Sequence, residues 1–213
     1  EAYQRKGVPM LKELLIATSN PHKVGEIAAI LAEAGLGEVA LISLAAYPGF
    51  VMPEEDGQTF AANSAIKARA AAAYSGLPAL ADDSGLAVAA LGGAPGVHSA
   101  RYAGAGHDDK ANRQKLLSAL KEVPAAERQA AFVCAATLAL PQAGGSLLLR
   151  RAEGRCAGAI AFEERGEQGF GYDSLFITAD YGCQMAELDG ERKNRISHRG
   201  RAIRQMVEWI KEG

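Results

Sequence analysis

Asp82 and Asp83 stand side by side after a short apolar run, residues 79–81, and are followed by Ser84 and Gly85. A buried strand has this appearance where it delivers polar groups to the rim of a sheet. Neighbouring carboxylates repel, and apolar walls increase the repulsion, so such a pair is expected to hold a cation between its members or to share a proton. The pattern predicts a metal or acid–base site, with an acidic turn, in which Gly85 has a positive φ, as the alternative.

A second polar segment follows the first apolar strand, which is expected over residues 14–17. Ser19 or Asn20 suits the N-cap of a helix and Pro21 its first position, so free backbone N–H groups and Lys23 would point out of this turn. Such a turn can bind a phosphate, although an ordinary capped helix with a solvated lysine has the same pattern. The chain has neither a G-x-x-x-x-G-K-[ST] loop nor a G-x-G-x-x-G loop, which disfavours the two common nucleotide folds.

Two later segments could complete a binding site. Residues 169–173 surround Phe170 and Tyr172 with glycines, which suits either a tight turn with packed rings or a base stacked on an aromatic face. Residues 193–199 hold three cations and His198, where a solvated helix start is the alternative. The four histidines lack paired metal-ligand spacing, so zinc is not expected.

An alternation of strands and helices must position these residues. Apolar runs predict strands over residues 14–17, 38–43, 79–81, 130–140, 146–150, 154–161 and 175–178, with a further apolar run at 86–91. Helical spacing predicts helices that begin at Pro21 and Asp108, one over residues 59–75 capped by Gly76, and a mostly helical tail over 185–212. Residues 130–140 and 146–150 are expected to pair antiparallel across a Gly-Gly turn in a second lobe.

Composition narrows the class of protein. The 213 residues, 48% of them hydrophobic, suffice for one large domain or two closely packed lobes. Lys and Arg number 23 and Asp and Glu 25, so neither nucleic acid nor an anionic membrane is the expected partner. Three widely spaced cysteines and the lack of a long apolar run favour a soluble protein of the reducing cytoplasm. We expect residues 1–9 to be a leader or disordered arm and residues 10–213 to form one domain.

Six motifs in a fixed order connect these segments. They are Thr18-Ser19-Asn20-Pro21-His22-Lys23, Thr59-Phe60-x-x-Asn63-x-x-x-Lys67-Ala68, Ala81-Asp82-Asp83-Ser84-Gly85-Leu86, Gly92-Gly93-Ala94-Pro95-Gly96-Val97-x-Ser99-Ala100-Arg101-Tyr102, Gly169-Phe170-Gly171-Tyr172-Asp173 and Ser197-His198-Arg199-Gly200. From residue 11 onwards the chain resembles the inosine triphosphate pyrophosphatase-like family, and within it the bacterial branch of dITP/XTP pyrophosphatases.

The resemblance implies an α/β fold of two lobes, with a long central mixed β-sheet flanked by helices and the active site in the cleft between the lobes. It also implies a homodimer that requires Mg²⁺, one or more ions per subunit. The expected activity is hydrolysis of XTP, ITP and dITP to the monophosphate and pyrophosphate, which cleanses the nucleotide pool before such bases enter DNA or RNA. The expected partner is the small-molecule nucleotide, with no nucleic acid and no membrane.

By resemblance, Asp83 is the catalytic acid that activates water and helps to hold Mg²⁺. Glu54 matches the metal ligand of the acidic loop, although adjacent Glu55 could serve instead, and Ser84 contacts substrate. The phosphate chain is expected on Thr18, Ser19, Asn20, Pro21, His22 and Lys23. The nucleoside is expected on Phe170, Gly171, Tyr172, Asp173, Lys193, His198 and Arg199, and Ser174 follows where family members often have proline.

This assignment predicts a mechanism. A triphosphate carries about four negative charges, and Lys23, Lys193 and Arg199 are expected to cancel most of them together with Mg²⁺. Donors from His198, Arg199 or the backbone are expected to pair with the oxygen at C6 of hypoxanthine or xanthine and to face another donor in adenine. Guanine shares that oxygen, so its exclusion needs a further group.

The rivals are a serine hydrolase that uses Ser84 with His198, disfavoured by the lack of a G-x-S-x-G elbow, and a sensor that binds nucleotides without hydrolysis.

Overall fold

One mixed sheet runs through the chain. The computed structural model describes residues 11–212, so the expected leader, residues 1–9, lies outside the described residues. Six strands lie in the order β2-β1-β3-β4-β5-β6, with β1, β2 and β3 parallel and the remaining pairs antiparallel. Their bounds are β1 (Glu13–Ile16), β2 (Ala40–Ser43), β3 (Ala79–Val88), β4 (Gln129–Pro141), β5 (Leu147–Ile160) and β6 (Phe176–Thr178).

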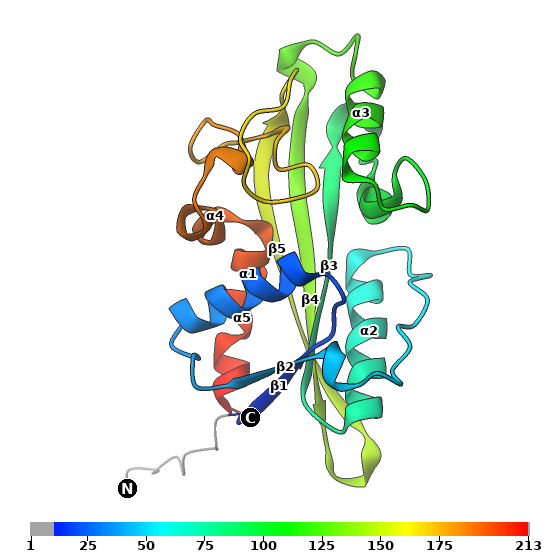
Figure 1. The fold of residues 1–213 in the computed structure, drawn as a ribbon, viewed down its shortest axis with the longest axis vertical. Helices are drawn as coiled ribbons and strands as arrows, with labels where there is room; N and C mark the ends of the chain where they lie inside the picture. The colour runs from blue at the N-terminus through cyan, green and yellow to red at the C-terminus, as the bar shows by residue number, and fades with distance from the viewer. Residues whose placement is uncertain (1–10, 213) are drawn as a thin grey trace, which may run out of the picture.

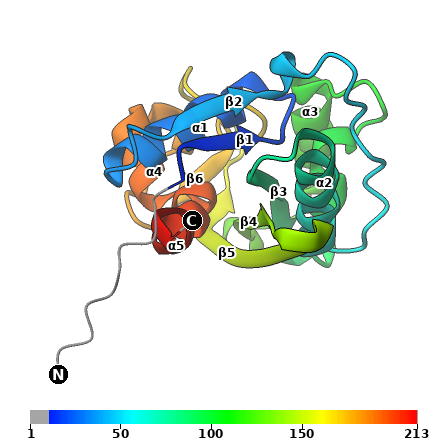
Figure 2. The same ribbon diagram turned by 90° about the horizontal axis from the view of Figure 1, so that it is seen from below.

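Helices flank both sides of this sheet. In the described part of the chain the α-helices are α1 (Pro21–Glu33), α2 (Phe60–Ser75), α3 (Asp109–Ala119), α4 (Gly190–Ile196) and α5 (His198–Glu212). Figure 1 shows β3, β4 and β5 running the length of the molecule, with α1, α2 and α5 around their lower part and α3 beside their upper part. From below, α2 lies on one side of the sheet and α5 on the other (Figure 2). The predicted α/β fold with a long mixed sheet is confirmed.

Capping residues explain where the helices begin and end. Thr59 accepts a hydrogen bond from the N–H of Ala62 at the start of α2, and Gly76 ends that helix with a left-handed φ of 72°. Asp108 caps α3 in the same way through the N–H of Ala111. These bonds satisfy backbone groups that a helix end leaves without partners, so the predicted boundaries hold within a residue or two.

Successive residues of β3 pack against different helices, because side chains alternate across a strand. Leu80 lies in a core that also contains residues of α1 and α5, whereas Ala79 and Ala81 lie against the buried alanines of α2. The same alternation decides where the polar residues that follow on β3 must point.

The course of β3 differs from the predicted short strand. The strand continues through both aspartates to Val88 and pairs with β4 over its whole length. The expected strand end and the acidic turn are therefore wrong, and Gly85 does not have a positive φ. Gly85 instead allows close approach, because a Cβ there would clash with the Ser99 hydroxyl and the Gly96 carbonyl oxygen.

Two other expected boundaries also change. Residues 146–150 and 154–161, predicted as separate strands, form the single strand β5, which pairs antiparallel with β4 across a turn containing Gly144 and Gly145, as predicted. Gly154 does not end the strand because it lies directly under α5, where only hydrogen fits. The predicted helical tail divides into α4 and α5 at Ser197.

No helix within residues 11–212 combines the length and the apolar character that crossing a membrane requires. Cys134, Cys156 and Cys183 are free thiols, and the first two are buried. Their expected role as packing residues is consistent with the position of Cys134 and Cys156 in the core.

We predict that Gly154→Ala lowers the free energy of unfolding by about 2 kcal/mol, because overpacking a close contact forces the backbone to shift. A Cβ at position 154 would lie 2.6 Å from the backbone nitrogen of Ala202 and closer still to the carbonyl oxygen of His198. Urea denaturation measures the change, with Gly37→Ala, which would meet no atom within 4 Å, as the control. Equal stability of the two variants would contradict this account of the β5–α5 contact.

Candidate active site

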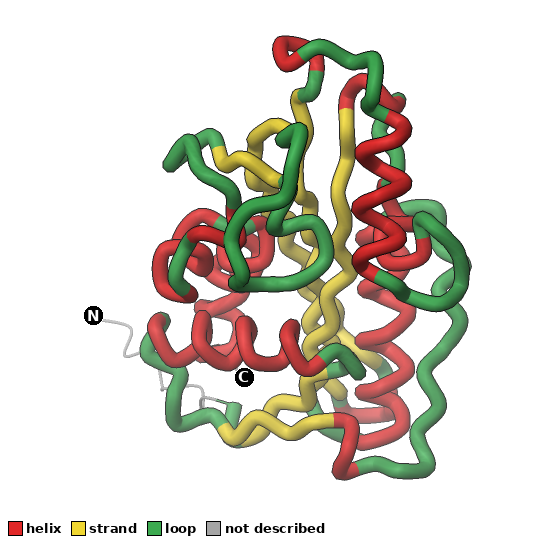
Figure 3. Tube along the Cα trace, turned by 45° about the horizontal axis from the view of Figure 1, so that its top comes forward, coloured by secondary structure: helices red, strands yellow, loops and turns green. Residues whose placement is uncertain are grey.

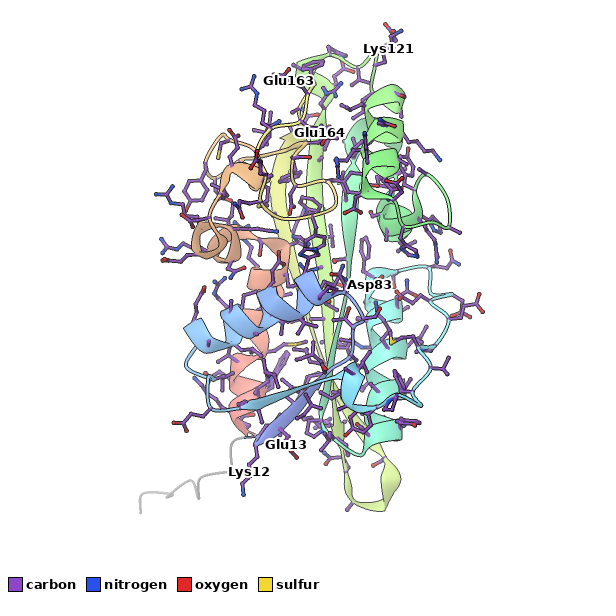
Figure 4. The ribbon with its side chains drawn as sticks, in the orientation of Figure 1. Lys12, Glu13, Asp83, Lys121, Glu163 and Glu164 are labelled. Carbon is purple, nitrogen blue, oxygen red and sulfur yellow. The ribbon has the colours of Figure 1, made fainter. Side chains whose placement is uncertain are left out.

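A cavity of about 570 Å³ lies beside the middle of β3. It opens there because β1 pairs with β3 only as far as Leu80, which leaves the following part of that edge without a neighbouring strand. Asp83 is at this point, between α2 and the N-terminal end of α1 (Figure 4), and loops close over the upper part of the sheet (Figure 3). The cavity is lined by every predicted site residue except Glu54, namely Thr18, Ser19, Asn20, Pro21, His22, Lys23, Asp83, Ser84, Phe170, Gly171, Tyr172, Asp173, Lys193, His198 and Arg199.

The two aspartates point to opposite faces of the sheet. Asp82 faces α1 and α5, and its Oδ2 lies 3.1 Å from Nζ of Lys23 and 3.0 Å from Nη2 of Arg199. Asp83 faces α2, where its carboxylate accepts hydrogen bonds from Lys67 and Asn63, both at 3.2 Å. The expectation of a cation held between the two carboxylates, or of a shared proton, is therefore wrong.

Different surroundings give the two carboxyl groups different pKa values. Asp82 is fully buried, which by itself would raise its pKa, but Arg199, Lys23 and Lys67 outweigh burial and hold the pKa well below its usual range. For Asp83 burial prevails over Lys67 and Lys23, and its pKa is raised. Asp82 is thus held as an anion, whereas the raised pKa of Asp83 gives it a higher proton affinity than an exposed aspartate.

Glu55, and not Glu54, is the acid of its loop that reaches the cavity. Oε2 of Glu55 lies 2.9 Å from Nζ of Lys67, which also contacts Asp83. Glu54 is exposed and does not line the cavity. Of the two acids that the sequence left open, Glu55 is therefore the one that shares a contact with Asp83.

The turn at residues 18–23 is organised differently from the prediction. Oδ1 of Asn20 accepts hydrogen bonds from the N–H groups of His22 and Lys23, at 2.9 and 3.4 Å, so these two groups are not free for a phosphate. Pro21 occupies the first position of α1, as expected. The side chain of Lys23 turns towards Asp82 and is only 14% exposed.

A buried ion-pair cluster lies behind the aromatic loop. Nζ of Lys193 lies 2.6 Å from Glu26 and 2.7 Å from Asp173. Arg199 binds Glu26 and Asp82, and its Nη2 also donates to the Ser84 hydroxyl at 3.0 Å. Arg199 is a donor that cannot accept the Ser84 proton, and among residues 11–212 no histidine or carboxylate is hydrogen-bonded to Ser84, which disfavours the hydrolase alternative.

The site residues that sequence reasoning missed are Glu26, Asn63 and Lys67. Asn63 and Lys67 were part of a quoted motif but had no role assigned to them. Their signal was spacing, since Asn63 and Lys67 lie four residues apart on the buried face of an alanine-rich helix. Glu26 follows Lys23 by one helical turn, which places both on the face of α1 towards the cavity.

Four cations of the site, Lys23, Lys67, Lys193 and Arg199, are already paired with carboxylates. Among the described residues, those that line or back the cavity include five cations, Lys23, Lys67, Arg101, Lys193 and Arg199, and six carboxylates, Glu26, Glu55, Asp82, Asp83, Asp109 and Asp173. The expectation that Lys23, Lys193 and Arg199 cancel most of the charge of a triphosphate together with Mg²⁺ stays a prediction, and each of these side chains already has a carboxylate partner. A polyanionic ligand needs a further cation to bind here.

Two rings mark the part of the cavity suited to a flat aromatic ligand. The His22 and Phe170 rings are stacked, with centroids 5.2 Å apart and planes 18° from parallel. His198 stacks on Phe132 at 4.8 Å, and its Nδ1 is buried without a hydrogen-bond partner among residues 11–212. Burial and the neighbouring Arg199 hold the pKa of His198 well below its usual value, so its imidazole is neutral at physiological pH.

We predict that Asp82→Asn lowers the free energy of unfolding by about 4 kcal/mol at about pH 7, because it leaves the buried Arg199 without its main partner. The folded-state pKa of Asp82 lies below its unfolded value of about 3.9, so the stabilisation is present above that pH and is lost as the pH falls further. Urea titrations of the wild type and the variant over a pH series test both points. A difference that grows in acid would contradict the ion-pair account.

Comparison with known proteins agrees with the six motifs. Residues 14–209 match the Ham1 family. A dITP/XTP pyrophosphatase of Haemophilus influenzae is 48% identical over 195 residues, which cover 91% of this chain and 96% of that protein. One of Geobacter sulfurreducens is 51% identical over 200 residues, covering 94% and 97%. The structure of a HAM1 protein from Coxiella burnetii matches with a TM-score of 0.81 and 41% identity, covering 96% of this chain and 100% of that one. The chain belongs to the Ham1 family.

Proposed function

We propose that this protein hydrolyses deaminated purine nucleoside triphosphates, namely dITP, XTP and ITP, to the monophosphate and pyrophosphate, and so keeps such bases out of DNA and RNA. The observation that carries the proposal is Asp83, a carboxylate held by Lys67 and Asn63 in a cavity shared with the turn at residues 18–23 and the aromatic loop. The names of the relatives, dITP/XTP pyrophosphatases, support these substrates.

In the proposed reaction Asp83 accepts a proton from a water molecule whose oxygen forms a bond to the α-phosphorus. The bond from that phosphorus to the oxygen that bridges to the β-phosphorus breaks, and pyrophosphate leaves. Burial raises the pKa of Asp83, which makes it a better proton acceptor than an exposed aspartate. Lys67 and Asn63 each bind one of its oxygens and so fix the carboxylate's orientation.

Mg²⁺ is the cofactor that we propose for this site, held by Glu55 and Asp83. The two carboxylates fit, because they converge on a single cation, Nζ of Lys67, at 2.9 and 3.2 Å. Among the described residues there is no group of three His, Cys, Asp or Glu that could hold a metal, so the remaining ligands would be water and phosphate oxygens, as is usual for Mg²⁺. When bound, the ion would offset the phosphate charge that the paired lysines cannot.

The base is proposed to lie against Phe170, near His198 and Arg199. Arg199 donates three hydrogen bonds to carboxylates and one to Ser84, so few of its N–H groups remain for a base. The unpartnered Nδ1 of neutral His198 can present either a donor or an acceptor, depending on the tautomer. As a donor it would bind the oxygen at C6 of hypoxanthine or xanthine and face the amino group of adenine.

A homodimer in the cytoplasm is also proposed. Val51 exposes 84% of its surface and Tyr74 54%, and Tyr74 packs on Tyr47 and Phe50, so this apolar surface suits contact with a second copy. The free thiols suit a reducing compartment. Light scattering on the purified protein tests the oligomeric state, and a monomer at all concentrations would contradict the dimer.

Pyrophosphate release from dITP, XTP, ITP, dATP and dGTP, measured side by side with Mg²⁺ and with EDTA, tests the function. We expect metal-dependent release from the first three and little from the others. Binding without release would identify a nucleotide sensor, and release of phosphate alone would mean a different bond is cleaved.

We predict that Asp83→Asn lowers kcat by about a thousandfold, because it removes the proton acceptor, while nucleotide binding persists. Its stability in EDTA should equal or exceed that of the wild type, since the raised pKa means that the ionised carboxylate is disfavoured in the fold at neutral pH. Single-turnover kinetics and urea denaturation measure the two effects. The matched control is Asp82→Asn, the same change at the neighbouring residue, which is expected to lower the free energy of unfolding. An Asp83→Asn variant that keeps its activity would remove Asp83 from its proposed role.

A further inference from the structure

The aromatic loop, residues 169–174, is held in place by α3, a helix to which the proposed chemistry assigns no role. The backbone N–H of Gly171 donates to Oδ2 of Asp109 at 2.8 Å, and the backbone oxygen of Gly171 accepts from Nη1 of Arg113 at 2.9 Å. Asp109 and Arg113 are four residues apart and therefore share one face of α3. Both sides of Gly171 are thus bonded to the same helix.

Arg113 also ties down the other end of the loop. Its Nε donates to Oε2 of Glu164 at 2.8 Å, and the same oxygen accepts from the Ser174 hydroxyl at 3.0 Å. Figure 4 shows Glu164 in the upper part of the molecule, well above Asp83. The network therefore acts on the position of the loop and not on the reacting atoms.

The helix that holds the loop is itself anchored to the cavity wall. The side chain of Asn112, buried in α3, donates to the carbonyl oxygen of Ala100 at 3.1 Å and accepts from the N–H of Ala103 at 2.7 Å. The Tyr172 hydroxyl donates to the carbonyl oxygen of Ser99 at 2.8 Å. Residues 99–103, α3 and the loop form one hydrogen-bonded wall that faces α1, where His22 stacks on Phe170.

The loop needs this external support. Gly169 and Gly171 have φ of 80° and 62°, in a region where glycine is freely accommodated and gives the backbone little stiffness of its own. A loop that becomes ordered only when a ligand binds loses conformational entropy at that step, and this loss weakens the affinity for the ligand.

We infer that Asp109 and Arg113 are positioning residues for base recognition, which hold Phe170 in place through the backbone of Gly171. This inference rests on the proposed function. It separates the site into two parts, because Asp83 is held by Lys67 and Asn63, and the turn at residues 18–23 by Asn20, through contacts that do not involve α3. Loss of the clamp should weaken affinity for the base and leave the rate of the bound complex largely unchanged.

The test compares Asp109→Ala, Asp109→Asn and Arg113→Met with the wild type. For each, kcat and KM for dITP are measured, together with Ki for inorganic tripolyphosphate, which has the phosphate chain but no base. We expect Asp109→Ala and Arg113→Met each to raise KM by about 5-fold, the effect of losing one or two hydrogen bonds, with Ki for tripolyphosphate unchanged. Asp109→Asn keeps an oxygen that can accept from Gly171 and should restore KM. Lys110→Ala, an exposed neighbour, is the control.

The following outcomes would overturn the inference that Asp109 and Arg113 hold the loop for base recognition. If the wild type turns over dITP and neither Asp109→Ala nor Arg113→Met raises KM, the clamp alone is overturned. An equal rise in KM and in Ki for tripolyphosphate, or an Asp109→Asn variant as impaired as Asp109→Ala, would show a general structural defect and overturn it as well. A wild type that releases no pyrophosphate from dITP would overturn the proposed function and the clamp with it.

Discussion

The buried contact between Asp82 and Arg199 joins three elements, and the geometry of the site depends on it. Arg199 lies in the first turn of α5, Asp82 lies in β3, and Glu26 of α1 binds the same guanidinium. A planar guanidinium presents donors in fixed directions, so it holds its partners in one arrangement. Removing such charges from water is unfavourable unless every partner is present, which ties the positions of α1, α5 and β3 to one another.

Alternation along β3 gives two identical side chains opposite tasks. Asp82 meets Arg199 and Lys23 on one face and serves as a fixed anion, whereas Asp83 meets Lys67 on the other, where burial raises its pKa. Neither task could be assigned from residue type, because both residues are aspartate. The strand separates an anchor from a reactive group by the smallest possible step along the chain.

Local patterns were sufficient to predict α1, α2 and α3 and the antiparallel pairing of β4 with β5, whereas the residues that gather at the cavity were assigned by the family resemblance. The predictions from local patterns failed where contacts between residues far apart in the chain determine the structure. The polar run at Asp82 to Gly85 has the composition of a turn, but it remains a strand because β4 pairs with it. Its charges are neutralised by Lys67, which is 16 residues from Asp83 in the chain, and by Arg199, which is 117 residues from Asp82. Glu26 was missed for the same reason, since its partners Lys193 and Arg199 come from the far end of the sequence.

The balance of cations and carboxylates around the cavity also governs how a nucleotide arrives. A cleft with a net positive charge attracts anions from a distance and raises their association rate, an effect that salt suppresses. Here each buried lysine and the arginine is bound to a carboxylate, and the whole chain carries a formal net charge of −2. This pairing leaves little uncompensated positive charge at the cavity to attract a free triphosphate from a distance, so capture depends mainly on contacts made at short range.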